Sequence, residues 1–393
     1  MEVGISITNQ ILLILRQVVI LQNISYTYYM IILVLTNNCA GLYNFRREVM
    51  KAFIDRGNRV YISAPLDDKS PDVEKMGCRI IATEFNRQGT NPIADLKLMW
   101  CYHKQIKQVR PDVVLSYTIK PNLYGGMVCA LMGVPQIANV TGLGAAVEYP
   151  GLMQKLTIFL YKMGMRNTRL TFFQNTDNLS FCQEHGMVKG PVQLIPGSGV
   201  NLQYHMKKPY PAETEPIRFL FLGRIRREKG IEEYLAAAET ITKKYDNVEF
   251  HVVGGCEGDY NEKLHELQSR GVITYHGSQM DVRPFIAMAA CTLHPSFYPE
   301  GMSNVLLETC SAGRPIMTTM RAGCREIIED GHNGYVVKQQ NTEDLIAKVE
   351  KFLALPYAAR KAMGDAAREK VEREFDRNIV VKAYLDAIAE IKA

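Results

Sequence analysis

Residues 217–230 read IRFLFLGRIRREKG and contain the unit from which the whole chain is built. Five of the six residues before Gly223 are apolar, which predicts a short buried strand. A basic loop follows, and residues 231–245, IEEYLAAAETITKKY, then repeat apolar side chains at the spacing of a helix. A buried strand that leads into a helix is the repeating unit of a parallel sheet covered by helices.

The same unit recurs on both sides of this stretch. Helical segments such as NFRREVMKAFIDRG (44–57) and NVLLETCSAG (304–313) separate apolar runs of strand type. Because strands and helices alternate, we expect an α/β protein with two doubly wound, Rossmann-like domains. The other predicted strands are IILVLTN (31–37), RVYISAP (59–65), RIIATEF (79–85), DVVLSYT (112–118), QIANVT (136–141), LTFFQN (170–175), VEFHVVG (248–254), VITYHG (272–277), CTLHPS (291–296) and PIMTTM (315–320).

A domain boundary is predicted in residues 195–211, IPGSGVNLQYHMKKPYP, which are rich in Gly, Pro and polar residues. We therefore expect a first domain at 30–200 and a second domain at 201–375. Residues 376–393 predict a C-terminal helix that crosses back to the first domain. Residues 1–29 are apolar but lack the charge pattern and cleavage site of a signal peptide. We treat them as an extension to which the sequence assigns no role.

The composition is that of a globular protein, with 393 residues of which 47% are hydrophobic and 22% charged. The nine cysteines include no CxxC pair, which argues against a zinc or redox motif and favours a reducing cytoplasm. The sequence has no run of 18 apolar residues, so it predicts no membrane span. Residues 30–205 hold 19 Lys and Arg against 12 Asp and Glu. We therefore expect an anionic partner such as phosphate or a membrane surface, and no nucleic acid, although scattered surface lysines would give the same balance.

The loop GRIRREKG has the residue types that bind a diphosphate. Gly223 allows a ligand to approach the backbone closely. Arg224 offers a planar fork of donors and Lys229 a point charge, and both follow a strand end, where open α/β sheets bind ligands. A solvated cluster of basic residues is the alternative reading. Two histidines, His276 and His294, also end strands and can line the same cleft.

A second group of polar residues follows another strand end, in SFYPEGMSNVLLET (296–309). Glu300 stands in the loop, and Glu308 follows eight residues later, where its carboxylate can accept from two vicinal ribose hydroxyls. A loop carboxylate and a solvent-facing helix residue are the respective alternatives. Backbone amides at the start of a helix bind oxyanions. The residues at that start are Gly301, Met302, Ser303 and Asn304.

Together, GRIRREKG, PSFYPEGMSNVLLETCSAGRPI (295–316) and EIIEDGHNGYVV (326–337) resemble the retaining nucleotide-sugar glycosyltransferases of family four. That family has the GT-B fold, so the resemblance implies two Rossmann-like domains that face a cleft. It implies catalytic roles for Arg224, Lys229 and Glu300, the cations on the diphosphate and the glutamate near the transferred sugar. It implies that Glu308 binds the ribose. The donor-binding residues that it implies are Gly223, Arg224, Lys229, Glu300, Gly301, Met302, Ser303, Asn304 and Glu308.

The first half resembles a narrower group, which extends lipid-diphosphate-linked sugars in bacterial polysaccharide and glycan assembly, such as capsule or O-antigen. The similar stretches are TNNCAGLYNFRREV (36–49), SYTIKPNLYGG (116–126), NVTGLG (139–144) and IPGSGV (195–200). Many members of the family have a histidine near residues 117–119, where this chain has none, so no role is carried over from it. The acceptor-binding candidates in these stretches are Gly41, Tyr43, Arg46, Thr118, Lys120 and Gly142.

We therefore expect a retaining enzyme that moves a hexose or N-acetylhexosamine, such as N-acetylgalactosamine, from a UDP-sugar to a saccharide on polyprenyl diphosphate. The sequence has no DxD motif. We expect neither a metal nor another cofactor, since cations and helix amides can neutralise the leaving UDP. A GT-B nucleotide-sugar epimerase and a non-catalytic nucleotide-sugar-binding protein are the alternatives. Transfer, isomerisation or mere binding of a labelled UDP-sugar separates the three.

One further segment predicts where the enzyme works. Residues 150–170, PGLMQKLTIFLYKMGMRNTRL, mix large apolar side chains with four cations. Such a mixture is typical of a helix that lies on anionic lipid without spanning it, so we expect a peripheral protein on the inner face of the cytoplasmic membrane. A core helix with cations that merely face solvent is the alternative. The four cations are Lys155, Lys162, Arg166 and Arg169.

Overall fold

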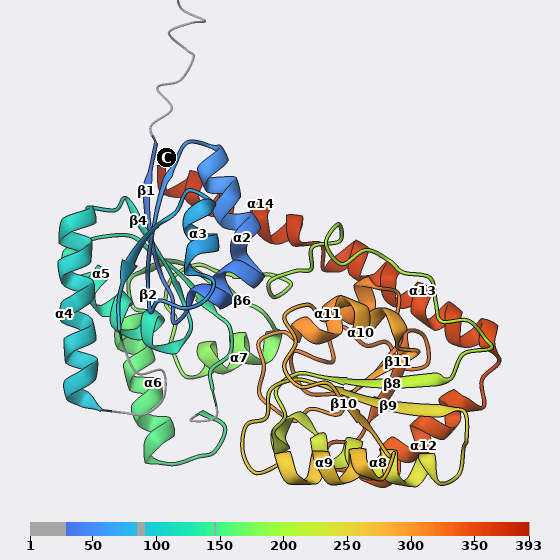
Figure 1. The fold of residues 1–393 in the computed structure, drawn as a ribbon. Helices are drawn as coiled ribbons and strands as arrows, with labels where there is room; N and C mark the ends of the chain where they lie inside the picture. Colours follow the sequence, from blue (N-terminus) through green and yellow to red (C-terminus); the bar gives the residue numbers. More distant parts are fainter. Residues whose placement is uncertain (1–28, 85–90, 145–146, 393) are drawn as a thin grey trace, which may run out of the picture.

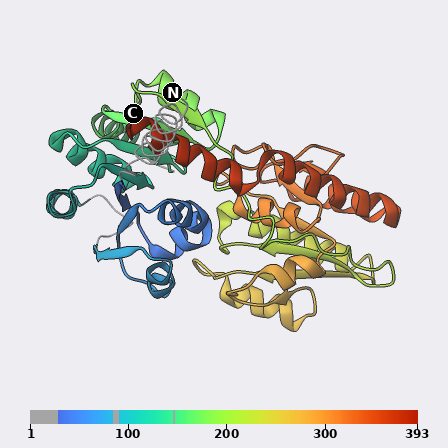
Figure 2. The ribbon, with the colours of Figure 1, turned by 90° about the horizontal axis from the view of Figure 1, so that it is seen from above.

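The computed structural model describes residues 29–84, 91–144 and 147–392, so nearly all of the extension predicted at 1–29 lies outside the described residues. Two parallel sheets form two lobes that lie side by side (Figures 1 and 2). Helices cover both faces of each sheet (Figure 1). The expected α/β class, with two doubly wound domains, is confirmed.

The first lobe contains a seven-stranded parallel sheet in the order β3-β2-β1-β4-β5-β6-β7. Its central strands are buried on both faces, which explains their continuous apolar runs. The strands are β1 (Ile31–Leu35), β2 (Arg59–Ala64), β3 (Arg79–Ala82), β4 (Val113–Tyr117), β5 (Gln136–Val140), β6 (Thr168–Phe173) and β7 (Val192–Leu194). The helices are α2 (Cys39–Asp55), α3 (Ser70–Lys75), α4 (Pro92–Val109), η1 (Pro121–Gly125), α5 (Gly126–Met132), α6 (Leu152–Gly164) and α7 (Thr176–Glu184).

The second lobe contains a six-stranded parallel sheet in the order β10-β9-β8-β11-β12-β13. Its strands are β8 (Ile217–Leu222), β9 (Val248–Val253), β10 (Thr274–Tyr275), β11 (Cys291–His294), β12 (Ile316–Thr319) and β13 (Gly334–Val337). Its helices are η3 (Arg227–Lys229), α8 (Ile231–Thr242), α9 (Asn261–Ser269), α10 (Arg283–Met288), α11 (Asn304–Ser311), α12 (Thr342–Leu353) and α13 (Tyr357–Glu374), and α14 (Arg377–Lys392) ends the chain.

Each sheet has a point at which the order of its strands reverses. The reversal falls between β1 and β4 in the first sheet and between β8 and β11 in the second. Loops that leave two such neighbouring strands diverge to opposite faces of the sheet and leave a crevice at the carboxyl ends. The loops after β8 and β11 carry Arg224 and Glu300, so two predicted donor residues lie at such a crevice.

The last two helices connect the lobes. α13 packs on α11 in the second lobe, whereas α14 packs on α2 in the first (Figures 1 and 2). Tyr384 of α14 is buried, and its ring centroid lies 4.7 Å from that of Phe172. Asn139 Nδ2 donates to the Tyr384 hydroxyl at 2.6 Å. The end of the chain therefore completes the hydrophobic core of the first sheet.

The two chain segments that cross between the lobes are paired with each other. Val200 forms a parallel bridge with Asp376. The adjacent Arg377 places Nη1 2.7 Å from Glu48 Oε2 on α2, and its Nη2 donates to the Gly199 carbonyl at 3.2 Å. Burial works to raise the pKa of Glu48, but Arg377 outweighs it and keeps the pKa low. One partly buried ion pair thus holds both crossings against the first lobe.

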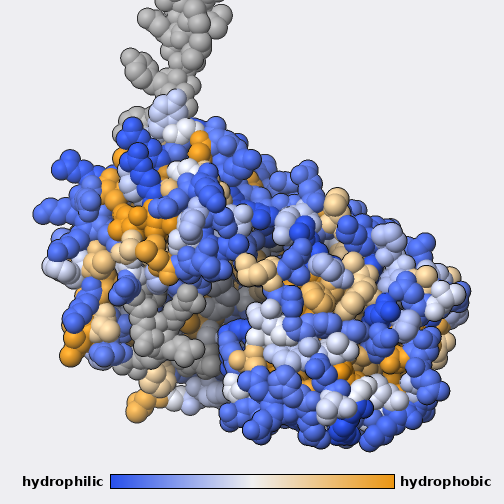
Figure 3. Space-filling model, viewed as in Figure 1, coloured by the Kyte–Doolittle hydropathy of each residue, from blue (hydrophilic) through white to orange (hydrophobic). Residues whose placement is uncertain are grey.

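An apolar surface runs over α4 and α6, which both pack on η1 and α5. Figure 3 shows apolar side chains at the lower ends of these two helices. The lysines and arginines of α6 and of the loop after it are exposed beside the apolar side chains. In the part of the chain that the structure describes, no helix is both long and apolar enough to cross a membrane. We call the apolar surface over these two helices the α4–α6 surface. Its exposed apolar residues are Ile93, Leu96, Trp100, Leu152, Met153, Leu156, Phe159 and Met163.

Candidate functional site

The basic loop after β8 brings three cations, Arg224, Arg226 and Lys229, to one aromatic ring. Gly223 has φ +138°, a conformation that L side chains rarely adopt, and an added Cβ would meet open space there. Arg224 is exposed, with its guanidinium carbon 5.7 Å from the centroid of the Tyr298 ring. Lys229 is buried, with Nζ 4.9 Å from the same centroid. Arg224 is therefore accessible to a ligand, whereas Lys229 is held in place.

Lys229 is held by a carboxylate from the neighbouring loop. Its ammonium forms an ion pair with Glu300, and His294 Nε2 lies 3.7 Å from Glu300 Oε1. Burial works to raise the pKa of Glu300, but His294 and Lys229 outweigh it and hold the pKa at about 2. Burial also lowers the pKa of His294, so the imidazole is neutral at pH 7. Glu300 is thus an ionised carboxylate that pairs with Lys229 and lies close to the His294 imidazole.

The loop that carries Glu300 is pressed against the first lobe. A Cβ added to Gly301 would lie 2.5 Å from the Thr141 carbonyl oxygen and 2.5 Å from Gln174 Oε1. Only glycine fits between these atoms, which belong to the residues that follow β5 and β6.

One of the backbone amides at the start of α11 is already bonded within the second lobe. The Ser303 amide donates to the Gly323 carbonyl at 2.8 Å. That amide is therefore occupied, and oxyanion binding at this helix start is left to its neighbours.

Asn175 makes the hydrogen bonds that join this loop to the first lobe. The side chain is buried, and Nδ2 donates to the Gly301 carbonyl at 2.6 Å and to the Glu300 carbonyl at 3.1 Å. Its Oδ1 accepts from the Asn178 amide at 2.9 Å and caps α7. Asn175 was not predicted from the sequence. The available signal was its position as a polar residue at the end of the apolar run LTFFQN.

The predicted phosphate residues line one cavity of about 320 Å³ between the lobes. The first lobe closes it with the loops after β4 and β5. Among the described residues, no group of three or more His, Cys, Asp or Glu side chains is placed to hold a metal ion. The donor candidates that line this cavity, which we call the donor cavity, are Arg224, Lys229, Glu300, Gly301, Met302 and Asn304.

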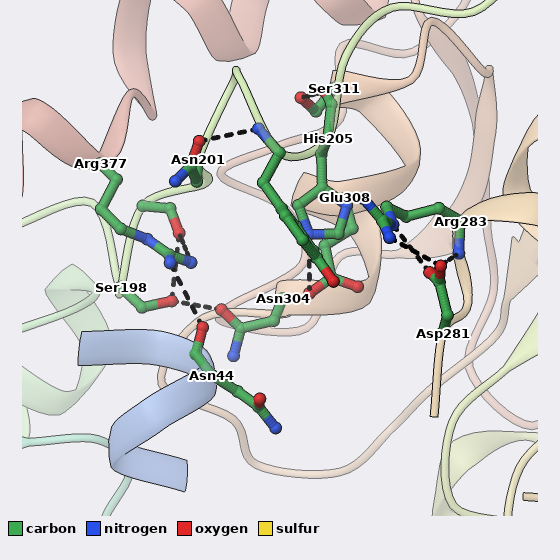
Figure 4. A network of polar contacts seen from close by, with 12 residues as sticks. Asn44, Ser198, Asn201, His205, Asp281, Arg283, Asn304, Glu308, Ser311 and Arg377 are labelled. Atoms are coloured by element: carbon green, nitrogen blue, oxygen red, sulfur yellow. Dashed lines mark hydrogen bonds and ion pairs between the residues drawn. The ribbon is translucent and has the colours of Figure 1, made fainter. Parts of the chain in front are cut away.

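Glu308 lies one helical turn beyond Asn304 and lines a separate cavity of about 410 Å³ (Figure 4). Its carboxylate is not solvent-facing, since the side chain is only 18% exposed. His205 Nε2 lies 3.8 Å from Glu308 Oε1. Burial raises the pKa of Glu308 to about 7 and lowers that of His205 to about 4. At pH 7 about half of this carboxyl is therefore ionised, next to a neutral imidazole.

The acceptor candidates are not gathered in one place. Gly41, Arg46 and Thr118 line a cavity of about 190 Å³ at the strand-order reversal of the first sheet. Tyr43 lines the cavity of Glu308, whereas Gly142 and Thr118 line the donor cavity. The residues predicted to bind the acceptor therefore do not form one site.

Lys120 does not reach the cleft. The residue precedes η1, and its side chain turns back to α4, where Nζ lies 2.9 Å from Asp95 Oδ1. Tyr124 donates to the other oxygen of the same carboxylate at 2.7 Å. This ion pair holds α4 against η1, so the role that the structure supports for Lys120 is packing, not acceptor binding.

Thr118 combines an unusual backbone with a central position. Its φ is +74°, a left-handed conformation that is costly for a β-branched residue, by about 1–3 kcal/mol. The residue lines both the donor cavity and the cavity next to it in the first lobe. Strain of this kind persists where the surrounding structure needs the geometry, which marks the loop after β4 as part of the site.

Two family profiles match the chain, and together they take up most of it. The profile described as "Glycosyl transferases group 1" matches residues 204–370, and the one described as "Glycosyl transferase 4-like" matches residues 32–175. The first match contains the loops of Arg224 and Glu300. The second contains the loops after β4 and β5 that close the donor cavity.

Individual relatives agree with the profiles. The chain is 27% identical over 367 residues to an N,N'-diacetylbacillosaminyl-diphospho-undecaprenol alpha-1,3-N-acetylgalactosaminyltransferase of Campylobacter jejuni, covering 88% of this chain and 95% of that one. It is 27% identical to the capsular polysaccharide biosynthesis glycosyltransferase CapM of Staphylococcus aureus, covering 72% and 77%. The crystal structure of Anabaena Alr3699/HepE in complex with UDP and glucose superposes with a TM-score of 0.76 at 16% identity, over 92% of this chain and 100% of that one. The chain therefore belongs to the group 1 glycosyltransferases and is an enzyme of GT-B fold that transfers a sugar from a nucleotide sugar.

Proposed function

We propose that this enzyme transfers a hexose or N-acetylhexosamine from a UDP-sugar, with retention of configuration, to a saccharide carried on polyprenyl diphosphate. The observation that carries the proposal is the donor cavity, where an ionised Glu300 pairs with Lys229 beside Arg224. Two cations suit a diphosphate, and a carboxylate beside them suits the hydroxyls of the sugar attached to it.

The assignment of UDP rests on the neighbouring cavity. Asn304 and Glu308 are one turn apart on α11, so a ligand whose phosphates lie by the start of this helix extends toward the Glu308 carboxylate. A ribose there would donate its two vicinal hydroxyls to the carboxylate. The superposed structure of HepE contains UDP, which supports this choice of nucleotide.

The cations would act when the donor breaks. The bond between the anomeric carbon and the phosphate oxygen breaks, and its electron pair stays on UDP. Arg224 and Lys229 then stabilise the charge that develops on the diphosphate. The acceptor hydroxyl attacks the anomeric carbon from the face that UDP leaves, and its proton passes to the departing phosphate oxygen. No metal or other cofactor takes part in this proposal.

The acceptor is proposed from the relatives and from the surface. The Campylobacter relative carries an undecaprenol diphosphate acceptor in its name. On α6, Leu152, Leu156, Phe159 and Met163 recur every three or four residues, so they share one face, and all are exposed. A core helix would bury that face. The cations beside it complement anionic lipid, which supports peripheral docking on the cytoplasmic leaflet, where the nine free thiols would stay reduced.

One experiment tests the whole proposal. The purified enzyme is incubated with a panel of UDP-sugars labelled in the sugar and with bacterial membrane lipids. We expect label in the organic-solvent extract for one UDP-hexose or UDP-N-acetylhexosamine, together with stoichiometric UDP. Conversion of the donor to an isomer or free sugar without lipid labelling would contradict transfer and favour the epimerase. Binding without turnover for every donor would favour a non-catalytic protein.

A further inference from the structure

Another cavity between the lobes, of about 270 Å³, has no part in the donor binding proposed above. Its first-lobe wall comes from the loop after β5, the first turn of α6 and the first turns of α7, and its second-lobe wall comes from the loops after β11 and β12. We call it the acceptor chamber. It shares Gly144, Pro299 and Glu300 with the donor cavity. The two cavities therefore meet at Glu300, beside which the transferred sugar is proposed to lie.

We propose that the acceptor chamber binds the terminal saccharide of the acceptor and presents its hydroxyl to the donor at Glu300. The inference rests on the proposed function. The position of the chamber supports this, because it is lined by Glu300 but not by Arg224 and Lys229, which line the donor cavity. A hydroxyl there is within reach of the reacting centre without entering the donor's own space.

The walls of the chamber carry polar donors and an aromatic ring that suit a sugar. Asn178 Nδ2 and Arg321 Nε are both buried and have no hydrogen-bond partner among the described residues. Buried donors of this kind are normally paired, so these two await an acceptor atom. Hydroxyl or N-acetyl oxygens of a sugar would supply it. Phe181, stacked on His185 with centroids 4.1 Å apart, adds an apolar face suited to the C–H face of a sugar ring.

Ion pairs between the two lobes complete the chamber. Glu148 in the first lobe forms an ion pair with Arg321 in the second, and both line the chamber. Asp177 forms another with Arg325 next to it. A site that exists only when the lobes meet would assemble the acceptor and donor together and exclude water, which limits donor hydrolysis.

The chamber wall includes part of the helix that carries the proposed lipid surface. Gln154, in the first turn of α6, lines the chamber and donates to the Val147 carbonyl at 2.7 Å. Leu152, Met153 and Leu156 on the same turns are exposed on the α4–α6 surface. A saccharide whose terminal sugar lies in the chamber would therefore leave it beside the apolar face that we propose to contact the membrane.

The test measures acceptor kinetics in Asn178→Ala and Glu148→Gln. Octyl hexosides and octyl N-acetylhexosaminides serve as acceptor probes beside the membrane-lipid fraction, and released UDP is measured. We expect the KM for the acceptor to rise about tenfold in each variant, because Asn178→Ala removes a proposed donor to the sugar and Glu148→Gln breaks the ion pair that holds Arg321 in the chamber wall. The KM for the donor and the UDP affinity should stay within about twofold. UDP release without acceptor should not fall.

Gln183→Ala is the matched control, because it removes an exposed amide from the same helix α7 outside the chamber. It should keep the parent's kinetics, and thermal melting should show all variants folded. A parent enzyme that transfers sugar, with both chamber variants unchanged in acceptor KM, overturns this inference alone. Equal rises in donor and acceptor KM overturn it too. A parent that transfers to no probe and to no lipid overturns the proposed function and the inference together.

Discussion

The side-chain amide of Asn175 donates to the backbone carbonyl of Gly301 at 2.6 Å, across the interface between the two lobes. Asn175 stands at the end of β6 in the first lobe, and Gly301 follows Glu300 in the loop of the second. A second bond from the same Nδ2, to the Glu300 carbonyl at 3.1 Å, joins this side chain to two successive carbonyls of the loop. The first lobe therefore positions the carboxylate that lines both cavities, although the residue has no contact with either cavity.

Substitution of Asn175 should separate positioning from folding. Asn175→Ser keeps an oxygen that can cap α7 but has no amide to bond the loop, so we expect kcat to fall about 10- to 100-fold with little change in UDP affinity. Asn175→Ala loses the cap as well and should also lower the stability by about 1 kcal/mol. Steady-state kinetics and thermal melting give both readouts. A serine variant with the parent's kcat would show that the bonds to the loop are only structural.

Removal of the diphosphate cations should slow the reaction strongly. Arg224→Ala and Lys229→Ala should each lower kcat/KM by about 100-fold or more, as loss of one electrostatic donor does. The control is Arg227→Ala, since Arg227 is exposed in the same loop and only 4.0 Å from Glu232. It should turn over normally. Near-normal rates for both Arg224→Ala and Lys229→Ala would remove the diphosphate assignment.

UDP affinity should depend on pH through Glu308. Burial raises the pKa of this carboxyl to about 7, and a ribose would donate to its ionised form. Binding should therefore release a proton, and affinity should rise with pH. At pH 6 about one-tenth of the carboxyl groups are ionised, so the Kd for UDP should be about tenfold higher than at pH 8.

Calorimetry with Glu308→Gln supplies the control, because the phosphates of UDP titrate equally with both proteins. The variant should bind UDP more weakly at pH 8 and should lack the part of the pH dependence that is due to Glu308. Glu300→Ala should reduce turnover far more than UDP affinity. If the pH profiles of the parent and Glu308→Gln coincide, Glu308 does not bind the nucleoside.

The α4–α6 surface should hold the enzyme on anionic lipid. Each Lys or Arg near such a surface contributes about 1 kcal/mol, so we expect flotation with anionic liposomes at low salt and release at high salt. Replacement of Lys155, Lys162, Arg166 and Arg169 by Gln should abolish flotation. The matched control replaces Lys243, Lys263, Lys351 and Lys361, exposed in the second lobe, and should still float. Equal flotation of both quadruple variants would assign the docking to another surface.

Chelation should leave the reaction intact. Because Arg224 and Lys229 are proposed to neutralise the leaving diphosphate, EDTA should change the rate of sugar transfer by less than about twofold. The assay is the labelled-donor reaction with and without EDTA. A loss of activity that Mg²⁺ or Mn²⁺ restores would contradict the proposed way in which UDP leaves.

Much of the fold could be predicted from local patterns. Apolar runs separated by helical spacing predicted five strands of the second sheet and six of the first, because burial on both faces leaves a continuous apolar signature. β13 (Gly334–Val337) and β7 (Val192–Leu194) were missed. β7 is a short edge strand that is largely exposed and has no apolar run. Strand ends were also predictable as binding positions, and Arg224, Lys229 and Glu300 lie together in one cavity.

The remaining features of the site depend on contacts between segments far apart in the chain. Sequence spacing showed that Glu308 follows Glu300 by eight residues, but not that α11 buries it near His205. It placed Lys120 beside the cleft residues, whereas packing of α4 on η1 gives this lysine to Asp95. Periodicity reports which face of one element is buried. Which faces of two elements meet, as Asn175 and Gly301 do across the lobes, is set by how the two sheets pack, and only the folded chain contains that information.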